Sequence, residues 1–395
     1  MSDKTVLIAG FSGRALAASA RRAGYQPLVV DAFGDADTRE LAAVCEVLAG
    51  ALHHGFRYDT LSAALDGLIE GASAKPVGLI LAAGFEDDPK LIARLEERYP
   101  LLGCSAATVR AAKDPTHLFS LLTNLGIAHP TTQRTPPVDG RGWNTERDEG
   151  PLKTITRSQA KQLTKRIGGS GGTHIARCKR TVRAHDDRYF QLEIAGEPIS
   201  MTGLVGKGAA FAFSRPWVAP MPRRPFRHGG VAGNIDLDAD LEARLIEIGV
   251  DVARNLGLKG LVSFDLILVD GVPNLIEVNP RPGAALDIFD DEKGTLFKAH
   301  ILAANGEDPT PLLTLDWNPE PRASACLYAS NDALEINHVT WPEWVSDRPV
   351  SGTVVAAHDP IATVHAVAQS AEVAATIAID RLGEIGAMLY GRQKN

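Results

Sequence analysis

Two apolar stretches separated by Asp270 and Gly271 constrain the fold of this chain more than any other feature. They read LVSFDLILVD and PNLIEVN, and each is long enough to form a strand. An Asp-Gly pair between two such stretches is a strong signal for a tight two-residue turn. We therefore expect an antiparallel hairpin over residues 261–279. The next residues, PRP, place Arg281 between two prolines, whose fixed φ angles limit how far its side chain can move.

The polar residues of this hairpin form a pattern suited to a metal ion. Asp265 lies on the first expected strand, and Glu277 and Asn279 lie two apart on the second, so they share one face. Such oxygen donors suit one or two Mg²⁺ ions, which complete their shells with water and nucleotide phosphates. Arg281 then supplies a rigid cation that can neutralise charge on a transferring phosphoryl group or an oxyanion. The alternative is a solvated sheet face without ligands.

A glycine-rich segment, QLTKRIGGSGGTHI, forms a second candidate site. We expect Lys165 at the end of a strand, a loop without large side chains, and a return strand at His174 and Ile175. Backbone N–H groups in such a loop can approach phosphate oxygens closely. The loop residues are Gly168, Gly169, Ser170, Gly171 and Gly172. No GxxxxGK motif is present, so this is not a Walker A loop.

Two lysines accompany the loop. Lys113, in AAKDP, and Lys165 would supply the two ammonium groups that a triphosphate requires. Further on, Gln191 and Glu193, in YFQLEIAGEPIS, can meet an adenine edge and ribose hydroxyls. The alternatives are a flexible surface loop, solvated lysines and exposed polar residues of a strand.

The N-terminal region has the pattern of an α/β domain. Strands are expected at Thr5–Ala9, Gln26–Val30 and Val77–Ala82, with a helix at 15–23 between the first two. Gly10, Gly13 and Asp31 resemble part of a dinucleotide-binding fingerprint, but the third glycine is absent. A structural turn or substrate contact is therefore favoured over an NAD-binding oxidoreductase.

Three further regions follow. We expect a helical stretch ending at Gly126, a connector over 135–151 that is rich in Pro, Gly and charge, and a helix at 241–256. Strands around SACLYAS and TVVAA and a helix at 371–389 then form a small α+β lobe. The expected division is 1–110, 111–310 and 311–395, consistent with a 395-residue chain that exceeds the usual size of one core.

The composition of the chain limits the classes of molecule that it is expected to bind. A net charge of −7 gives no electrostatic footprint for nucleic acid. The four cysteines are scattered without a CxxC pair, and neither a leader peptide nor a stretch of bilayer length is evident. We expect a cytoplasmic protein with small-molecule substrates and no membrane partner; a homodimer is one assembly open to it.

Taken in order, Lys113, the glycine loop with Lys165, the segment 191–200, Asp265 and the EVNPR motif at 277–281 resemble the ATP-grasp superfamily. The resemblance covers nearly the whole chain. It implies an ATP-grasp fold of the biotin-carboxylase type: a Rossmann-like preATP-grasp domain, a two-lobed nucleotide-binding domain and a C-terminal lobe.

The same resemblance implies the chemistry. Lys113, Lys165 and the glycine loop would bind the phosphates of ATP, Gln191 and Glu193 would lie near the adenine, and Asp265, Glu277 and Asn279 would bind Mg²⁺, or Mn²⁺ in its place. Lys165 and Arg281 would be catalytic. The family phosphorylates a carboxylate to an acyl phosphate, which an amine or another nucleophile attacks; this is a carboxylate–amine ligase reaction of the EC 6.3 type.

Two departures and two alternatives accompany this resemblance. Asp265 stands where biotin carboxylases carry glutamate, and the usual KP is Lys165-Arg166. The chain is also similar to carboxylate–amine ligases that include the tyramine–glutamate ligases of methanofuran biosynthesis, which favours amino-acid ligation for a methanofuran- or methylofuran-type coenzyme. The alternatives are a bicarbonate-using carboxylase and a catalytically silent nucleotide-binding regulatory protein.

Overall fold

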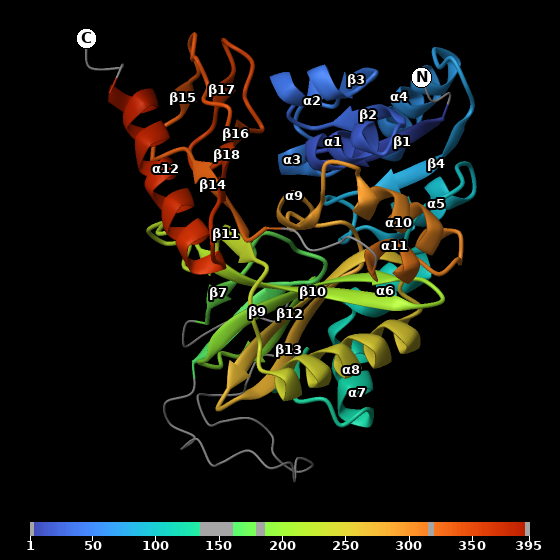
Figure 1. Ribbon diagram of the computed structural model, residues 1–395, viewed down its shortest axis with the longest axis vertical. Helices are drawn as coiled ribbons and strands as arrows, with labels where there is room; N and C mark the ends of the chain where they lie inside the picture. Colours follow the sequence, from blue (N-terminus) through green and yellow to red (C-terminus); the bar gives the residue numbers. More distant parts are fainter. Residues whose placement is uncertain (1–3, 135–160, 179–185, 315–319, 392–395) are drawn as a thin grey trace.

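The computed structural model describes residues 4–134, 161–178, 186–314 and 320–391. The connector expected over 135–151 lies outside these residues. Within them the chain combines parallel α/β and antiparallel α+β parts, as the sequence predicts (Figure 1).

The N-terminal part is a four-stranded parallel sheet in the order β3-β2-β1-β4. All six residues of the inner strand β1 are buried, as expected for a central strand of a helix-covered sheet. The predicted βαβ unit is confirmed, and so is the strand predicted at Val77–Ala82, which is β4; β3 was not predicted. The elements are β1 Thr5–Gly10, α1 Arg14–Arg22, β2 Gln26–Asp31, α2 Ala36–Leu41, β3 Val44–Val47, α3 Ala51–His54, α4 Tyr58–Glu70, β4 Pro76–Leu81 and α5 Pro89–Glu96.

Two helices, α6 (Ala106–Lys113) and α7 (Pro115–Asn124), occupy the stretch where the sequence suggested one. Asp114 interrupts it with an extended backbone (φ −77°, ψ 112°), and its carboxylate accepts the N–H of Thr116 at 2.8 Å. An acidic N-cap of this kind is worth about 1 kcal/mol, and Pro115 suits the first position of a helix. The break leaves Lys113 as the last residue of α6.

An eight-stranded antiparallel sheet in the order β13-β12-β9-β10-β11-β14-β18-β16 forms the centre of the molecule. The predicted hairpin is confirmed as β12 and β13. Asp270 (φ 50°) and Gly271 (φ 78°) join them in left-handed conformations, as a tight hairpin turn requires. The strands are β9 Glu197–Val205, β10 Ala209–Val218, β11 His228–Gly233, β12 Gly260–Val269, β13 Val272–Asn279, β14 Arg322–Tyr328, β16 Val345–Ser346 and β18 Pro360–Val367.

A small antiparallel sheet in the order β5-β8-β6-β7 carries the glycine-rich loop. Lys165 lies in β6, as expected, but the return strand does not include His174 and Ile175. The chain is still in a turn at His174, so β7 begins only at Ala176. The strands are β5 Thr132–Gln133, β6 Gln162–Arg166, β7 Ala176–Arg177 and β8 Arg188–Leu192.

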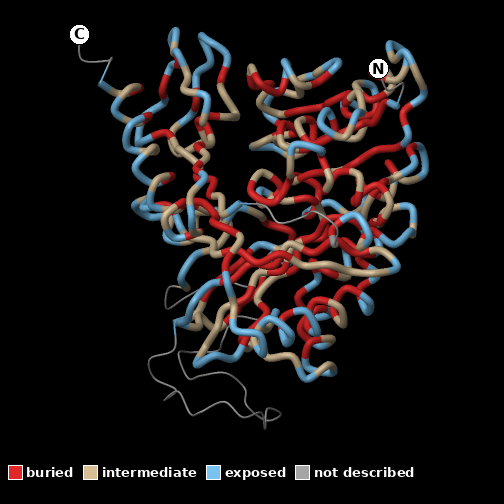
Figure 2. The backbone as a smooth tube through the Cα atoms, in the orientation of Figure 1, coloured by how far each residue is buried: buried red, intermediate tan, exposed pale blue. Residues whose placement is uncertain are grey.

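The C-terminal strands continue the central sheet. β14 pairs with β11, and α12 packs along β14 and β18. Figure 2 shows buried backbone running through the N-terminal sheet and the central strands. The remaining elements are α8 Ala239–Leu256, α9 Leu286–Phe289, α10 Thr295–Ala304, α11 Thr310–Thr314, β15 Leu334–Glu335, β17 Val354–Val355 and α12 Ala371–Gly391. Among the described residues, none of the helices has the length and apolar character needed to cross a membrane.

Candidate active site

The three oxygen-bearing residues of the hairpin lie together. Asp265 is paired with Glu277 across the two strands. Asp265 Oδ2 accepts a hydrogen bond from Asn279 Nδ2 at 3.0 Å, and its Oδ1 accepts one from Ser200 Oγ at 2.9 Å. Burial and the neighbouring charge of Glu277 raise the pKa of Asp265. Two carboxylates this close favour a cation between or beside them.

Lys113 supplies that cation in this structure. Its Nζ donates to Glu277 Oε1 and to Asn279 Oδ1, both at 2.7 Å, and the residue is only 8% exposed. Burial alone would raise the pKa of Glu277, but the charges of Lys113 and then Lys165 outweigh it and lower that pKa. Two oxygens from different residues thus converge on one positive charge.

We call Asp265, Glu277 and Asn279 the oxygen row. The position of Lys113 shows whether this oxygen row can hold a metal ion. An ammonium group held at 2.7 Å by a carboxylate and an amide oxygen marks a position where oxygen ligands already face a cation. No group of three or more His, Cys, Asp or Glu suited to a metal is found in the described part of the chain. The row has two carboxylates and an amide, and Mg²⁺ needs few protein ligands when nucleotide phosphates and water complete its shell. The residues fit, provided that the ammonium of Lys113 moves toward the phosphates.

Lys165 approaches the same place from the small sheet. It is 3% exposed, and its ammonium group makes no hydrogen bond with any residue that the structure describes. Burial lowers its pKa, while Glu277 and Asp265 act in the opposite direction. A buried ammonium without an acceptor is costly unless an anion occupies the site, which suits a phosphate group.

The glycine-rich loop is packed closely against two other segments. A Cβ on Gly168 would lie 2.4 Å from Asp87 Cα, and one on Gly172 would lie 1.7 Å from the carbonyl oxygen of Phe226. His228 N donates to Gly171 O at 3.1 Å. The glycines are therefore required by close approach as well as by positive φ, which is 69° at Gly168 and 74° at Gly172.

His174 is a residue that the sequence reasoning missed as part of the site. Its ring packs against Gly169, where a Cβ would lie 2.3 Å from the ring, and its Nδ1 is buried without a hydrogen-bond partner among the described residues. Burial lowers its pKa to about 4, so the ring is neutral at physiological pH. Together with Lys113, Gly168 and Glu277 it lines a space of about 320 Å³ that is open to solvent. The glycine motif beside it was the only available signal.

Arg281 does not contact the oxygen row directly. Its Nε donates to Glu86 Oε1 at 2.6 Å, and its side chain is 16% exposed. Glu86 also accepts the N–H groups of Gly84 at 2.9 Å and Phe85 at 3.1 Å. Burial would raise the pKa of Glu86, but Arg281, Lys113 and the N–H of Gly84 lower it to about 2. Glu86 was also missed, although it lies in the loop after the predicted strand at 77–82.

Gln191 lies in β8, an inner strand of the small sheet, and Glu193 directly follows that strand. Gln191 is 1% exposed and its Nε2 donates to Thr132 Oγ1 at 3.2 Å. The carboxylate of Glu193 is bound by Arg177, with Nη2 to Oε1 at 2.7 Å. Both side chains have protein partners, and their assignment to an adenine site stays a prediction.

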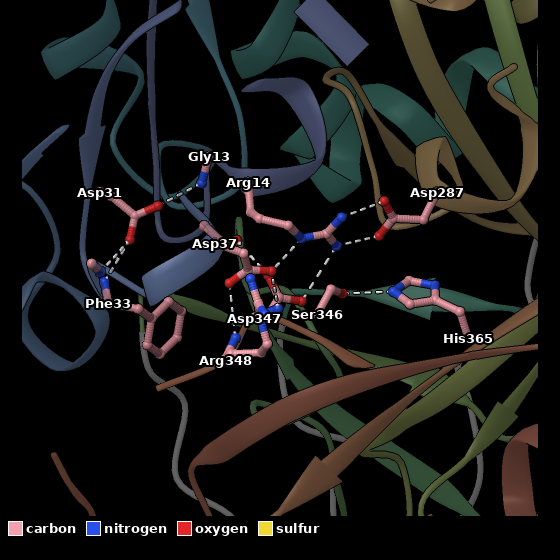
Figure 3. Close-up of polar contacts among 12 residues, drawn as sticks. Gly13, Arg14, Asp31, Phe33, Asp37, Asp287, Ser346, Asp347, Arg348 and His365 are labelled. Carbon is pink, nitrogen blue, oxygen red and sulfur yellow. Dashed lines mark hydrogen bonds and ion pairs between the residues drawn. The ribbon is translucent and has the colours of Figure 1, made fainter. Parts of the chain in front are cut away.

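The turn after β1 serves a structural purpose. Asp31 accepts the N–H groups of Gly13 at 2.7 Å, Phe33 at 2.7 Å and Gly34 at 2.8 Å (Figure 3). A carboxylate occupied in this way is not free to bind ribose hydroxyls, so the partial fingerprint carries no support for NAD. This agrees with the preference for a structural turn.

The sequence matches the family described as "ATP-grasp domain" over residues 113–285, which span Lys113, the glycine loop and the hairpin. A curated relative, the carbamoyl phosphate synthase large chain of Deinococcus deserti, is 26% identical over 232 residues. The match takes in 52% of this chain and 21% of that relative. The chain therefore corresponds to about a fifth of the length of the curated relative it matches.

Solved structures resemble the whole chain. Biotin carboxylase from Campylobacter jejuni superimposes with a TM-score of 0.67 at 13% identity, covering 95% of this chain and 91% of that one. N5-carboxyaminoimidazole ribonucleotide synthetase from Thermotoga maritima gives 0.62 at 15%, covering 96% and 98%. The biotin carboxylase domain of a Hydrogenobacter thermophilus 2-oxoglutarate carboxylase, solved with MgADP and bicarbonate, gives 0.65 at 15%, covering 96% and 88%.

These findings confirm the ATP-grasp fold and the ATP-grasp domain predicted from the sequence. They also agree with the predicted class of enzyme, an ATP-grasp ligase. ATP-grasp enzymes use ATP and Mg²⁺, in line with the oxygen row and the two buried lysines.

Proposed function

This chain contains an ATP-grasp domain, and from that premise we propose that it is an ATP-dependent ligase that activates a carboxylate as an acyl phosphate and joins it to an amine. One observation carries the proposal. Lys113 from α6 holds Glu277 and Asn279 from β13. The charges of Glu277 and Asp265 act on the buried Lys165 of β6. Gly168 and Gly169 of the glycine loop line one space together with Lys113 and Glu277. The charged and polar side chains of α6, β6 and β13 thus lie together, although these elements are far apart in the sequence. A solvated surface would not require such a buried arrangement.

The first step needs phosphates held in place. Lys165 and the glycine loop bind the phosphate chain, because a buried ammonium favours an anion and a loop without large side chains lets phosphate oxygens approach its backbone. Lys113 shifts from Glu277 and Asn279 to the phosphates. The oxygens of Glu277 and Asn279, with Asp265, would hold Mg²⁺, which would supply positive charge to neutralise the phosphates.

The carboxylate oxygen of the substrate attacks the γ-phosphorus, the bond to ADP breaks, and an acyl phosphate forms. The amine nitrogen then attacks the carbonyl carbon, inorganic phosphate leaves, and the amine loses a proton. In this proposal Arg281 neutralises charge on the phosphoryl group or the carbonyl oxygen. Since Glu86 fixes its guanidinium in advance, little reorganisation is needed during the reaction.

We also propose that residues 1–110, 111–310 and 311–395 act as three functional parts, with Gln191 and Glu193 near the adenine. For the substrates, similarity to tyramine–glutamate ligases favours glutamate and an aromatic amine, in the synthesis of a methanofuran-type coenzyme. That choice of substrates depends on the resemblance alone and is the finest level of the proposal.

The test is ADP release from MgATP with a matrix of carboxylates and amines that includes glutamate with aromatic amines. A pair that raises ADP release above either substrate alone supports the ligase. Release that depends strictly on bicarbonate would instead identify a carboxylase. Wild-type protein that binds nucleotide without turnover under any condition would favour a regulatory protein. Glu277→Gln, which removes charge without changing shape, should abolish turnover and leave the fold intact.

A further inference from the structure

Asp35 is a buried carboxylate for which no hydrogen-bond donor is found among the residues that the structure describes. It lies directly before α2, past the carboxyl end of β2, and is 7% exposed. Its side chain does not cap the helix, and it accepts no hydrogen bond from any residue that the structure describes. Three residues on, Thr38 is fully buried and its hydroxyl also lacks a partner in the described part of the chain.

The acidic residues around Asp35 are all satisfied. Asp31 accepts three backbone N–H groups, as described above, and Asp37 accepts those of Asp347 at 2.8 Å and Arg348 at 2.9 Å. Arg14 lies between two further carboxylates, with Nη1 to Asp287 at 2.6 Å and Nε to Asp347 at 3.0 Å (Figure 3). Within the described part of the chain, Asp35 is thus the carboxylate of this group for which no donor is found.

This arrangement is costly for the free protein. Burial, and then the charges of Asp347, Asp31 and Asp37, raise the pKa of Asp35 to about 8, and Arg14 offsets this only in part. A buried polar group that lacks its hydrogen bonds lowers the free energy of unfolding. Costs of this kind are commonly found where a ligand supplies the missing partner.

Asp35 lies on the side of the N-terminal sheet that faces Arg281. In the turn after β1, Phe11 N donates to Ala83 O at 2.9 Å, and Gly84 packs against the ring of Phe11. Two residues further, Glu86 binds Arg281. Arg14, in the helix that follows this turn, also binds Asp287, which lies six positions after Arg281 in the chain. The carboxyl ends of parallel strands are the usual place for ligands in such sheets.

The chemistry of the group favours an organic cation over a metal ion. The carboxylates around Asp35 do not form a metal-binding cluster, since none is found among the described residues. A single carboxylate without a donor among the described residues instead matches an ammonium group, which is larger and donates directional hydrogen bonds.

We propose that Asp35 binds a protonated amino group of one of the two substrates. This inference rests on the proposed ligase function and narrows it. A protonated amine has no lone pair and cannot attack an acyl phosphate, so the group bound here is remote from the reacting atoms. The substrate is therefore one of two kinds. It is either an amino acid whose ammonium group binds Asp35 while its carboxylate is activated, or a diamine that binds Asp35 with one nitrogen and reacts with the other.

Two matched pairs of probes separate these sources: L-glutamate against glutarate, and 1,4-diaminobutane against butylamine. Binding is measured by calorimetry in the presence of Mg²⁺ and a non-hydrolysable ATP analogue, and turnover by ADP release. Wild-type protein should prefer the ammonium-bearing member of one pair by at least about tenfold, as expected for a buried charge pair. Asp35→Asn should remove that preference while changing the response to the other member by less than about twofold.

A stability measurement distinguishes a ligand-binding role from a structural one. Because the pKa of Asp35 is raised from 3.8 to about 8, its cost develops as pH rises through this range and is complete above it. Asp35→Asn should therefore have a higher urea midpoint than wild type at pH 9 and a smaller gain at pH 5. Asp37→Asn is the matched control, and its midpoint should fall because it loses a backbone hydrogen bond.

The inference is overturned if wild-type protein binds and turns over both members of each pair equally. It is also overturned if Asp35→Asn keeps the preference for the ammonium-bearing member, or if its urea midpoint falls as that of Asp37→Asn does. Absence of ADP release with every pair, combined with an Asp35-dependent binding preference, contradicts the ligase function and leaves the ammonium site supported.

Discussion

Arg281 Nε donates a hydrogen bond to Glu86 Oε1 at 2.6 Å, and this contact joins residues 195 positions apart in the chain. It connects the hairpin that carries the oxygen row to the loop after β4 of the N-terminal sheet. Glu86 is 4% exposed, so the pair is largely removed from water. The orientation of Arg281, proposed to act in the reaction, therefore depends on a residue outside the ATP-grasp domain match.

Replacing Glu86 by Gln should lower kcat by about 10- to 100-fold with a smaller change in the KM for ATP, because Arg281 stays present but loses its charged partner. Steady-state kinetics measures both parameters. Asp87→Asn is the control: its ion pair with Arg166, at 3.2 Å, is more than a third exposed on both sides and should contribute little. Equal losses in the two variants would argue against a specific role for Glu86.

The same carboxylate predicts a pH effect on stability. The pKa of Glu86 is lowered from 4.5 to about 2, so its contribution to the free energy of unfolding is fully present above about pH 4.5 and is lost as pH falls toward 2. A shift of this size corresponds to about 3 kcal/mol. Urea unfolding of wild type and Glu86→Gln between pH 7 and pH 2.5 should show the difference between them shrinking with acidification. A difference that stays constant with pH would contradict this account.

The glycine-rich loop offers a matched pair of substitutions. Gly171 and Gly172 have similar φ angles, 65° and 74°, but a Cβ at Gly171 would meet nothing within 4 Å, whereas one at Gly172 would lie 1.7 Å from Phe226 O. Gly171→Ala should carry only the backbone penalty of about 1–2 kcal/mol. Gly172→Ala should also displace the loop and weaken binding of an ATP analogue by a further tenfold or so, at the usual 1.4 kcal/mol per factor of ten. Similar affinities for both variants would mean that the close approach is not needed for binding.

Lys113 occupies the position proposed for a metal ion. Mg²⁺ alone should therefore raise the Tm of the wild type very little, because the ammonium group holds Glu277 and Asn279. Lys113→Met should respond to Mg²⁺ alone, since it leaves those oxygens without a cation, but should lose affinity for nucleotide. Thermal unfolding with Mg²⁺, with and without an ATP analogue, checks both effects; Lys90→Met, at an exposed position, is the control. An unchanged Mg²⁺ response in Lys113→Met would place the metal elsewhere.

Local signals in the sequence predicted much of the fold. Asp270-Gly271 gave the hairpin because its left-handed turn is encoded in two adjacent residues. Asp114-Pro115 carried an equally local signal for a helix break, which the uninterrupted helical pattern concealed. Pairing of β14 with β11 joins segments about 90 residues apart, and no local pattern specifies such a partner.

The site was predictable as a set of residue types and not as a set of contacts. Lys113, Lys165, Asp265, Glu277 and Asn279 were selected for separate tasks, yet Lys113 binds the proposed metal ligands directly, across 164 positions. Glu86, His174 and Asp35 are single polar residues without a motif of their own. Their roles depend on what the fold places opposite them, and only the structure supplies that.

Transfer of oxygen from substrate to phosphate tests the central claim most directly. A carboxylate substrate labelled with ¹⁸O in both oxygens is turned over with MgATP and its amine, and the phosphate released is analysed by mass spectrometry. Formation of an acyl phosphate predicts one ¹⁸O in inorganic phosphate for each amide formed. Unlabelled phosphate, or label recovered in AMP, would contradict it.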